Sequence, residues 1–371
     1  MVGVTGSIPV LPTTGYRHPS RAPGRHTPHT SPLSCRVTQV EHPAMTELAL
    51  IGDIGGTNAR FALTDVSSAK PGILHEQTES DTDFHSLREA ALHYLGTIGA
   101  KPARAALAVA SPIEGDEITL TNRDWSFNRG ALQRALGLDQ LQLINDFAAI
   151  AWSAPHLSAS NRLPIHGTLA TPPQGPVTLI GAGTGLGVAL LTGSSEHGWH
   201  IVPTEGGHAS FAPIDNEERA IAAWLGVRHG RVSNERLLSG HGLSNIDAAL
   251  RGVAPVAAPA PQSGSRRSKD IVDAALSGKD ADAERALRRF CRIYGAVAGD
   301  AALLHGANTV LIAGGVVLHF LDFFRASDFM DAFLAKGRHT GYMQRMTVQV
   351  ITHPNPGLLG AAVAVRAAAA A

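Results

Sequence analysis

A glycine-rich turn between two apolar runs occurs twice in this chain, and the repeat restricts the folds that the sequence can adopt. The first copy, at 50–63, reads Leu-Ile-Gly-Asp-Ile-Gly-Gly-Thr-Asn-Ala-Arg-Phe-Ala-Leu. The second copy, at 179–190, reads Leu-Ile-Gly-Ala-Gly-Thr-Gly-Leu-Gly-Val-Ala-Leu. Glycine permits tight turns and lets backbone N–H groups approach phosphate oxygens without a Cβ in the way. One such turn near the start of each half predicts two lobes that close on one polyphosphate.

The residues after the first turn identify it as a β-hairpin rather than a strand-to-helix loop. Phe61 and Leu63 alternate with polar residues, a period of two that is typical of a strand. Neither G-x-G-x-x-G nor G-x-x-x-x-G-K-[ST], the nucleotide motifs that run from a strand into a helix, is present. One copy alone would favour an ordinary glycine hairpin. Two copies, the first carrying Asp53, Thr57 and Asn58, favour the phosphate hairpins of actin-like sugar kinases and therefore phosphoryl transfer.

Length and charge exclude several classes of protein. A chain of 371 residues fits two domains rather than one core. The formal net charge is zero, so nothing suggests nucleic acid or an anionic membrane as a partner, and no apolar run reaches the roughly 18 residues of a membrane-spanning helix. The two cysteines, Cys35 and Cys291, are far apart in unlike settings. We expect no disulfide, no multi-cysteine zinc site and a reducing, cytoplasmic location.

The first 44 residues differ in kind from the rest. They contain seven of the 22 prolines, many Ser, Thr, His and Arg, and one acidic residue, Glu41. Such a segment buries too little apolar surface to offset its ordering entropy. An organelle transit peptide is an alternative, but the prolines and the lack of amphipathic periodicity disfavour it. We predict a disordered extension over 1–44, or one produced by an upstream start codon, with the fold beginning near Met45.

The pattern of apolar residues predicts the same order of elements in both halves. The first half predicts strands at 48–53, 59–65, 73–79, 104–110 and 141–145, with helices at 83–97 and 128–136. The second predicts strands at 177–182, 187–192, 200–203, 309–313 and 346–352, helices at 216–228 and 281–305, a Pro/Ala/Ser/Gly loop at 254–266 and a final helix from Pro356. We predict an α/β fold of duplicated ribonuclease-H-like (actin-like ATPase) domains: mixed β-sheets flanked by helices, in two lobes with a central cleft. The predicted lobes are a small one at 45–150 and a larger one at 151–371, and the C-terminal helix can rejoin the small lobe.

Seven segments, in order from 48 to about 366, make the chain resemble the bacterial glucokinase family, ATP-dependent hexose kinases without a zinc motif. They are Gly-Asp-Ile-Gly-Gly-Thr-Asn-Ala-Arg (52–60), Leu-Ile-Asn-Asp-Phe (143–147), Gly-Ala-Gly-Thr-Gly-Leu-Gly-Val (181–188), Glu-Gly-Gly-His (205–208), Glu-Arg-Leu-Leu-Ser-Gly (235–240), Ile-Ala-Gly-Gly-Val (312–316) and Asn-Pro-Gly-Leu-Leu-Gly (355–360). The Cys-rich zinc loop of the related repressor–kinase family is missing. Ser111 departs from the family pattern, as do Thr204 and His241, which flank sugar-binding positions and leave the strictness of glucose preference open.

Asp146 is the candidate catalytic base. With Asn145 it ends a buried strand and precedes a helix, so a helix N-cap is the alternative on the sequence alone. The resemblance implies that the Asp146 carboxylate accepts the proton of the sugar 6-hydroxyl as that hydroxyl attacks the γ-phosphorus. One carboxylate as base, with positioning supplied elsewhere, is how kinases work.

The resemblance also implies the sugar-binding residues. They are Asn145, Asp146, Glu205, His208 and Glu235. Carboxylates, an amide and an imidazole suit hexose hydroxyls, each of which is both a donor and an acceptor. Without the motifs, the alternative for Glu235 is an acidic residue in the first turn of a helix, where it interacts with the helix dipole. The alternative for His208 is a core or surface histidine with no role in binding.

The nucleotide site is expected at the two hairpins. The candidate ATP-binding residues are Gly52, Asp53, Ile54, Gly55, Gly56, Thr57, Asn58, Gly183, Thr184, Gly185, Gly314 and Gly315. Asp53 distinguishes the hairpins, because Ala182 takes its place in the second copy. A carboxylate beside a polyphosphate is repelled unless a cation lies between them, so Asp53 is expected to orient Mg²⁺ through water.

The expected function is ATP-dependent glucokinase activity (EC 2.7.1.2), a glycolytic transferase reaction between D-glucose and MgATP. A kinase for another hexose is one alternative. A non-catalytic sugar-sensing regulator on the same fold is another, and it would need a helix-turn-helix ahead of the fold, where 1–44 offers only a Pro-rich tail. The sequence leaves the oligomeric state open, a homodimer included, and does not show whether another phosphoryl donor replaces ATP.

Overall fold

The computed structural model describes residues 47–55, 58–80, 83–111, 113–120, 124–169, 172–173 and 175–370. The predicted extension at 1–44 and two predicted phosphate-binding residues, Gly56 and Thr57, lie outside the described residues. All elements named below belong to one compact unit, Thr46–Ala371.

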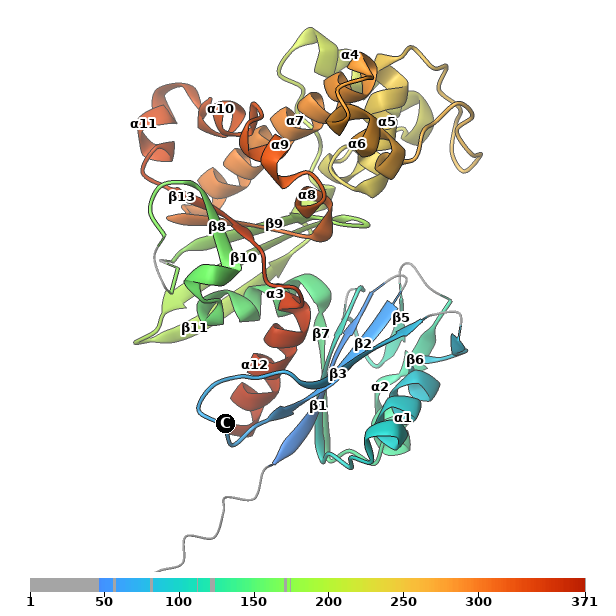
Figure 1. Ribbon diagram of the computed structural model, residues 1–371, viewed down its shortest axis with the longest axis vertical. Coiled ribbons are helices and arrows are strands. Elements are labelled where there is room, and N and C mark those ends of the chain that lie inside the picture. Colours follow the sequence, from blue (N-terminus) through green and yellow to red (C-terminus); the bar gives the residue numbers. More distant parts are fainter. Residues whose placement is uncertain are drawn as a thin grey trace, which may run out of the picture. The chain divides into compact units, whose positions relative to one another are not determined.

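The first sheet has five strands in the order β3-β2-β1-β4-β7 (Figure 1). Its strands are β1 (Leu48–Ile54), β2 (Asn58–Asp65), β3 (Leu74–Ser80), β4 (Arg104–Val109) and β7 (Gln140–Asn145). β2 is antiparallel to both β1 and β3, whereas β1, β4 and β7 are parallel. A separate short hairpin, β5 (Glu117–Thr119) with β6 (Ser126–Asn128), precedes β7.

The second sheet repeats this order. It runs β11-β10-β9-β12-β13, with β8 added at the edge. Its strands are β8 (Arg162–His166), β9 (Val177–Ala182), β10 (Leu186–Ser194), β11 (Gly198–Thr204), β12 (Thr309–Ala313) and β13 (Thr347–Ile351). In each sheet the first three strands of this order pair antiparallel, and the next two are parallel to the third strand. The shared pattern confirms the predicted duplication.

The longer helices are α1 (Leu87–Ile98), α2 (Arg129–Ala135), α3 (Asp146–Ser153), α4 (Asn216–His229), α5 (Gly240–Leu250), α6 (Ser268–Leu276), α7 (Ala281–His305) and α12 (Pro356–Ala370). All of them except α5 and α6, which the sequence pattern did not predict, lie close to predicted positions. The short ones are α8 (Gly315–Leu318), α9 (Leu321–Arg325), α10 (Phe329–Leu334) and α11 (Thr340–Met343). The prediction that a helix begins at 83 was wrong: α1 begins at Leu87, because the side chain of Ser86 caps it by accepting a hydrogen bond from the Glu89 N–H.

The last helix of the chain returns to the first sheet. α12, drawn in red, lies beside α3 and packs on β1 and β4 (Figure 1). A glycine makes the contact with α3 close: a Cβ on Gly360 would lie 1.6 Å from the carbonyl oxygen of Ala149. Because α3 also contacts β10 and β11, this helix pair joins the two sheets.

Each sheet has its own hydrophobic core. In the first, Phe61 of β2 stacks on Tyr94 of α1 with ring centroids 5.6 Å apart. In the second, α7 is the central helix, and its buried Tyr294 donates a hydrogen bond to the Ile180 carbonyl and accepts one from the Ala182 N–H, both 3.2 Å long. Tyr294 therefore anchors the end of β9, where the second glycine turn begins.

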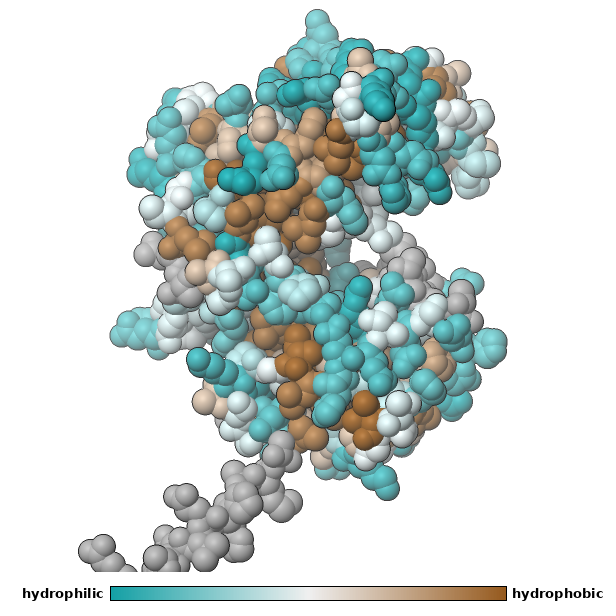
Figure 2. Space-filling view, in the orientation of Figure 1, coloured by the Kyte–Doolittle hydropathy of each residue, from teal (hydrophilic) through white to brown (hydrophobic). Residues whose placement is uncertain are grey.

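The surface on the face drawn in Figure 2 is hydrophilic over α4 to α6, and hydrophobic residues gather around α8 and α9. Among the described residues, every helix is too short or too polar to span a bilayer. Cys291 is buried in α7.

Candidate active site

A cavity of about 420 Å³ opens where the two sheets meet. Its walls come from both sheets and from the start of α3. Ten of the sequence-predicted site residues line it: Gly55, Asn145, Asp146, Gly183, Thr184, Gly185, Glu205, His208, Glu235 and Gly314. Segments separated by more than 200 residues in the chain thus converge on one concave site.

Both glycine segments are β-hairpins, as predicted. In the first, Ile54 pairs with Ala59 and the Gly55 N–H donates to the Asn58 carbonyl at 3.1 Å. In the second, Ala182 pairs with Leu186 and the Gly183 N–H donates to the Gly185 carbonyl at 2.8 Å. Gly55 and the 183–185 turn both line the cavity, so each sheet contributes its hairpin to the same space.

Asn145, rather than Asp146, caps α3. Its side-chain oxygen accepts hydrogen bonds from the N–H groups of Phe147 and Ala148, at 2.9 and 3.1 Å. The alternative of Asp146 as the N-cap was therefore wrong. Asp146 is the first helical residue, and its Oδ1 accepts one hydrogen bond, 2.8 Å long, from the Phe147 N–H. The amide side chain of Asn145 therefore caps the helix, and the carboxylate of Asp146 faces the cavity.

The electrostatic surroundings make Asp146 an unusually basic carboxylate. Burial raises its pKa from the ordinary 3.8 to about 6, against the hydrogen bond from Phe147, which lowers it. This value includes the smaller effect of the negative charges of Asp53 and Glu205, which also raise the pKa. A carboxylate with a pKa near neutrality can accept a proton from a hydroxyl and release it again, which is the property that a general base needs.

The three predicted sugar-binding side chains outside α3 lie together. His208 is between two carboxylates: its Nε2 is 3.8 Å from Oε2 of Glu205, and its Nδ1 is 3.9 Å from Oε1 of Glu235. Glu235 also accepts a hydrogen bond, 3.0 Å long, from the N–H of Leu186. Glu235 therefore links the imidazole to the second hairpin. The chain around Glu205 is held by Thr204, whose hydroxyl donates to the Val188 carbonyl and accepts from the Gly206 N–H.

Asp53 does not line the cavity. Its carboxylate lies against the start of α12, where a Cβ on Gly357 would be 2.7 Å from Oδ2. Burial raises the pKa of Asp53, and the charge of Arg60, its partner on β2, acts in the opposite direction. Asp53 is therefore a desolvated carboxylate close enough to Asp146 for their charges to interact. Among the described residues no group of three metal-ligating side chains converges.

Four other predicted nucleotide-binding residues lie outside the cavity wall: Gly52, Ile54, Asn58 and Gly315. Ile54 is buried in the first core, and Gly52 faces Leu107 within the sheet. These two belong to the strand that carries the hairpin. His241, a departure from the family pattern, lines an adjoining recess of about 380 Å³ that contains Thr184 and none of the predicted sugar-binding side chains.

The sequence did not predict the uncharged residues that shape the cavity. They are Ala110, Ser111, Phe147, Ile150, Gly181, Leu186, Gly187 and Thr204. Ser111 and Thr204 had been noted only as departures from a family pattern. Gly181 and Gly187 could have been predicted from the sequence, because they flank the second turn in the repeated segment. Nothing in the sequence indicated that both face the ring of Phe147.

Comparison with known proteins agrees with this geometry. The family model described as Glucokinase matches residues 50–368. A glucokinase of Yersinia pestis (strain Pestoides F) is 44% identical over 318 residues, which cover 85% of this chain and 96% of that protein. The crystal structure of a glucokinase from an Antarctic psychrotroph superposes with a TM-score of 0.73 at 33% identity, covering 86% of this chain and 99% of that one. A glucokinase from Balamuthia mandrillaris, solved with glucose, shares the fold at 20% identity, with a TM-score of 0.69 and coverage of 86% and 94%. The chain belongs to the glucokinase family.

Proposed function

We propose that this chain is an ATP-dependent glucokinase, which transfers the γ-phosphate of ATP to the 6-hydroxyl of D-glucose and yields glucose 6-phosphate and ADP. The observation that carries the proposal is the position of Asp146. This buried carboxylate, with a pKa of about 6, lies in one cavity with both glycine hairpins and with Glu205, His208 and Glu235. The 44% identity to a curated glucokinase supports the same activity.

In the proposed reaction, the oxygen of the sugar 6-hydroxyl forms a bond to the γ-phosphorus, and the bond from that phosphorus to the β,γ-bridging oxygen breaks. Asp146 takes the hydroxyl proton, and ADP leaves with the electron pair of the broken bond. Glu205, His208 and Glu235 hold the other sugar hydroxyls, so that the 6-hydroxyl is oriented toward Asp146. The hairpin N–H groups at Gly55 and 183–185 bind the phosphate oxygens. Closure of the lobes on both substrates would exclude water, which otherwise accepts the phosphoryl group.

The buried carboxylate of Asp53 suits a magnesium ion that is bound by the phosphates of ATP and contacts Asp53 through water. Mg²⁺ is usually held by one or two carboxylates with water and substrate phosphates. Asp53 is buried, and its charge interacts with that of Asp146, so a divalent cation nearby would relieve the repulsion between them. A bound Mg²⁺ ion would neutralise part of the negative charge of the phosphates. Asp53 would contribute by orienting the water molecules of the ion.

A coupled assay with MgATP and four sugars (glucose, mannose, fructose and N-acetylglucosamine) tests the proposal. We expect glucose to have the highest kcat/KM, at least about tenfold above the other three, because a misplaced hydroxyl leaves a polar group of the site unpaired. A higher value for another sugar would identify a kinase for a different hexose. No turnover of any of the four would support the non-catalytic sugar sensor instead.

A further inference from the structure

A second cavity, of about 480 Å³, adjoins the proposed sugar site. It shares His208 and Glu235 with that site but not Asp146, so it lies beyond the sugar-binding side chains on the side away from the base. Its other lining residues are Arg228, His229, Arg231, Ser233, Arg236 and Ala258. They come from the end of α4, the segment that follows it and the loop at 254–266. We call this cavity the basic recess.

The arginines of the basic recess keep their positive charge uncompensated. Arg228 donates to the Val256 carbonyl and, at 2.7 Å, to Oε1 of Gln262. Arg231 donates to the His208 carbonyl at 2.8 Å and to the Ser210 hydroxyl. These acceptors are neutral. Among the described residues, neither these two arginines nor Arg236 forms an ion pair with a carboxylate.

The one carboxylate of the basic recess is already engaged. Glu235 accepts a hydrogen bond from the Leu186 N–H through Oε2, and its Oε1 faces His208. Three guanidinium groups and one carboxylate leave a net positive charge of two, without counting His208 and His229. The pKa of His229 reflects this positive charge: burial lowers the pKa, and the charges of Arg236 and Arg228 lower it as well.

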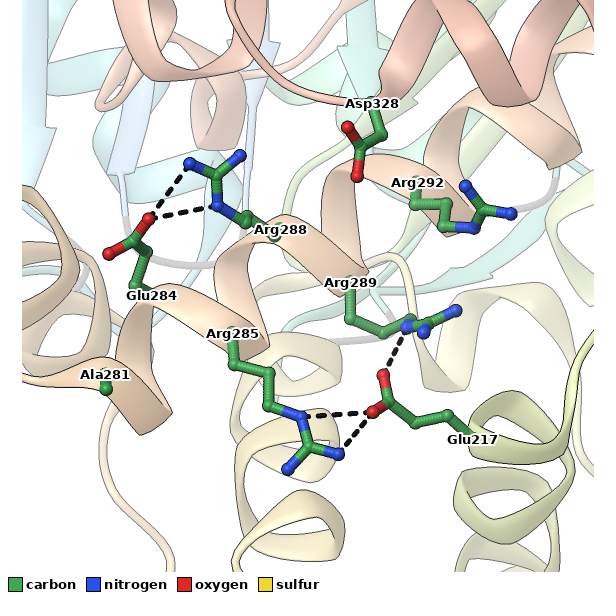
Figure 3. A pocket seen from close by; sticks show the side chains of 8 residues that line it. All are labelled: Glu217, Ala281, Glu284, Arg285, Arg288, Arg289, Arg292 and Asp328. Atoms are coloured by element: carbon green, nitrogen blue, oxygen red, sulfur yellow. Dashed lines mark hydrogen bonds and ion pairs between the residues drawn. The ribbon is translucent and has the colours of Figure 1, made fainter.

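In a second arginine cluster of the same chain, carboxylates neutralise most of the arginine charges. Figure 3 shows Arg285, Arg288, Arg289 and Arg292 on one face of α7, lining a cavity of about 410 Å³ with Glu217, Glu284 and Asp328. Glu217 pairs with both Arg285 and Arg289, and Arg288 pairs with Glu284 at 3.0 Å. Arg289 is also 2.7 Å from Asp215. That cluster is an ion-pair network between α7 and α4, whereas the basic recess has no such partners among the described residues.

We propose that the basic recess binds the phosphate group of a small phosphorylated molecule, or free phosphate. Guanidinium groups bind phosphate oxygens with paired, charge-assisted hydrogen bonds, and three of them converge here. The volume fits a small ligand. Arg236 is exposed and its side chain has no structural bond among the described residues, so it is the arginine that can reach an anion without disturbing the fold.

Occupation of the basic recess changes sugar binding, a consequence that rests on the proposed function. An anion in the recess contacts His208, and hydrogen bonds made to the anion are lost to a sugar hydroxyl. The phosphorylated ligand therefore raises the apparent KM for glucose. It leaves kcat unchanged, because Asp146 does not line the recess.

The test is calorimetric titration of the full chain, saturated with MgAMPPNP so that the phosphate hairpins are filled. Inorganic phosphate and glucose 1-phosphate are titrated into wild type, R236Q and R288Q. We expect R236Q to weaken binding of the phosphate group about tenfold, the effect of one lost charge-assisted contact. R288Q, which removes an exposed arginine from the compensated cluster on α7, serves as the matched control and should change the dissociation constant by less than about twofold.

The two ligands distinguish the source of the phosphate. Similar affinities indicate a site for free phosphate, and a glucose 1-phosphate affinity at least tenfold higher indicates a sugar-linked one. Equal binding to R236Q and R288Q, or no binding to either, overturns the proposal. Melting curves of both variants exclude misfolding as the cause. Failure of the proposed function is seen separately, as a lack of AMPPNP binding or of glucose turnover.

Discussion

Gly187 of β10 lies directly under the aromatic ring of Phe147, the residue that follows the candidate base. A Cβ on Gly187 would be 2.3 Å from Cδ2 of that ring, and one on Gly181 would be 2.7 Å from Cε2. The two glycines pair with each other on the two strands of the second hairpin, so the Phe147 ring packs the first turn of α3 against those strands. The position of Asp146 therefore depends on the absence of side chains at two places in the other sheet.

The substitution Gly187→Ala should displace the Phe147 ring and shift Asp146 with it. We expect the free energy of unfolding to fall by about 1–3 kcal/mol, the usual cost of overpacking, and kcat to fall by at least tenfold. Urea denaturation and the coupled assay measure the two effects. Gly96→Ala in α1 is the control, because a Cβ there meets nothing within 4 Å. If Phe147→Leu fails to restore any stability to Gly187→Ala, the contact is not the cause.

Replacing Asp146 by Asn keeps the size of the side chain and removes the proton acceptor. We expect kcat to fall by about 10²–10⁴-fold, the range for loss of a general base, while glucose affinity changes only a few-fold. Steady-state kinetics and glucose titration measure the two quantities. Asp139→Asn, an exposed aspartate just before β7, should leave both unchanged. Near-normal turnover of Asp146→Asn would remove it from the reaction.

The raised pKa of Asp146 predicts the pH dependence of turnover. The base must be ionised to accept a proton, so kcat/KM should be constant above about pH 7 and fall below about pH 6, tenfold for each further pH unit. A profile of kcat/KM between pH 4.5 and 8.5 tests this. An inflection near pH 4 would mean that the carboxylate is not held in its desolvated position.

The same pKa has a consequence for stability. Because the pKa of Asp146 in the folded protein, about 6, is higher than its ordinary 3.8, the folded state binds the proton more tightly. The stability that this proton binding contributes is complete below about pH 4 and is lost as the pH rises through 6. Asp146→Asn should therefore match wild type near pH 4 and exceed it at pH 8, by at most about 3 kcal/mol at roughly 1.4 kcal/mol per pKa unit. Equal unfolding free energies at pH 8 would contradict this electrostatic account.

Replacing Glu235 by Ala removes one wall of the proposed sugar site. The carboxylate bonds the Leu186 N–H and faces His208, so both the hairpin and the imidazole lose a partner. We expect the apparent KM for glucose to rise at least tenfold, with a smaller fall in kcat. Glu196→Ala, an exposed acid in the turn between β10 and β11, is the control. An unchanged KM would place Glu235 outside the sugar site.

Local patterns predicted the fold class and most of the elements, but not β5, β6, β8, α5 or α6. The period of two after the first glycine turn predicts a hairpin, its repeat predicts the second, and the repeated order of elements predicts the duplication that the two sheets show. The final helix was predicted from Pro356, where α12 begins. The start of α1 was misjudged, because Phe84 continues the apolar spacing while Ser86 caps the helix. Periodicity reports which residues face the core, and a cap depends on one side chain.

The site was predictable where a side chain carries charge and less so where shape matters. Asp146, Glu205, His208 and Glu235 belong to motifs, and the structure brings all four to one cavity. Asp53 does not line that cavity, and its carboxylate lies against the start of α12, a contact between residues about 300 apart in the chain. The ring of Phe147 against Gly187 is likewise a contact between sheets. Such contacts follow from tertiary packing, which no local pattern encodes.

The most direct test of the account is a crystal structure of the chain with glucose and MgAMPPNP. We predict that the γ-phosphorus lies between Gly55 and the 183–185 turn, with the glucose 6-hydroxyl within hydrogen-bonding distance of Asp146. Phosphates bound away from either hairpin, or a 6-hydroxyl directed away from Asp146, would contradict it.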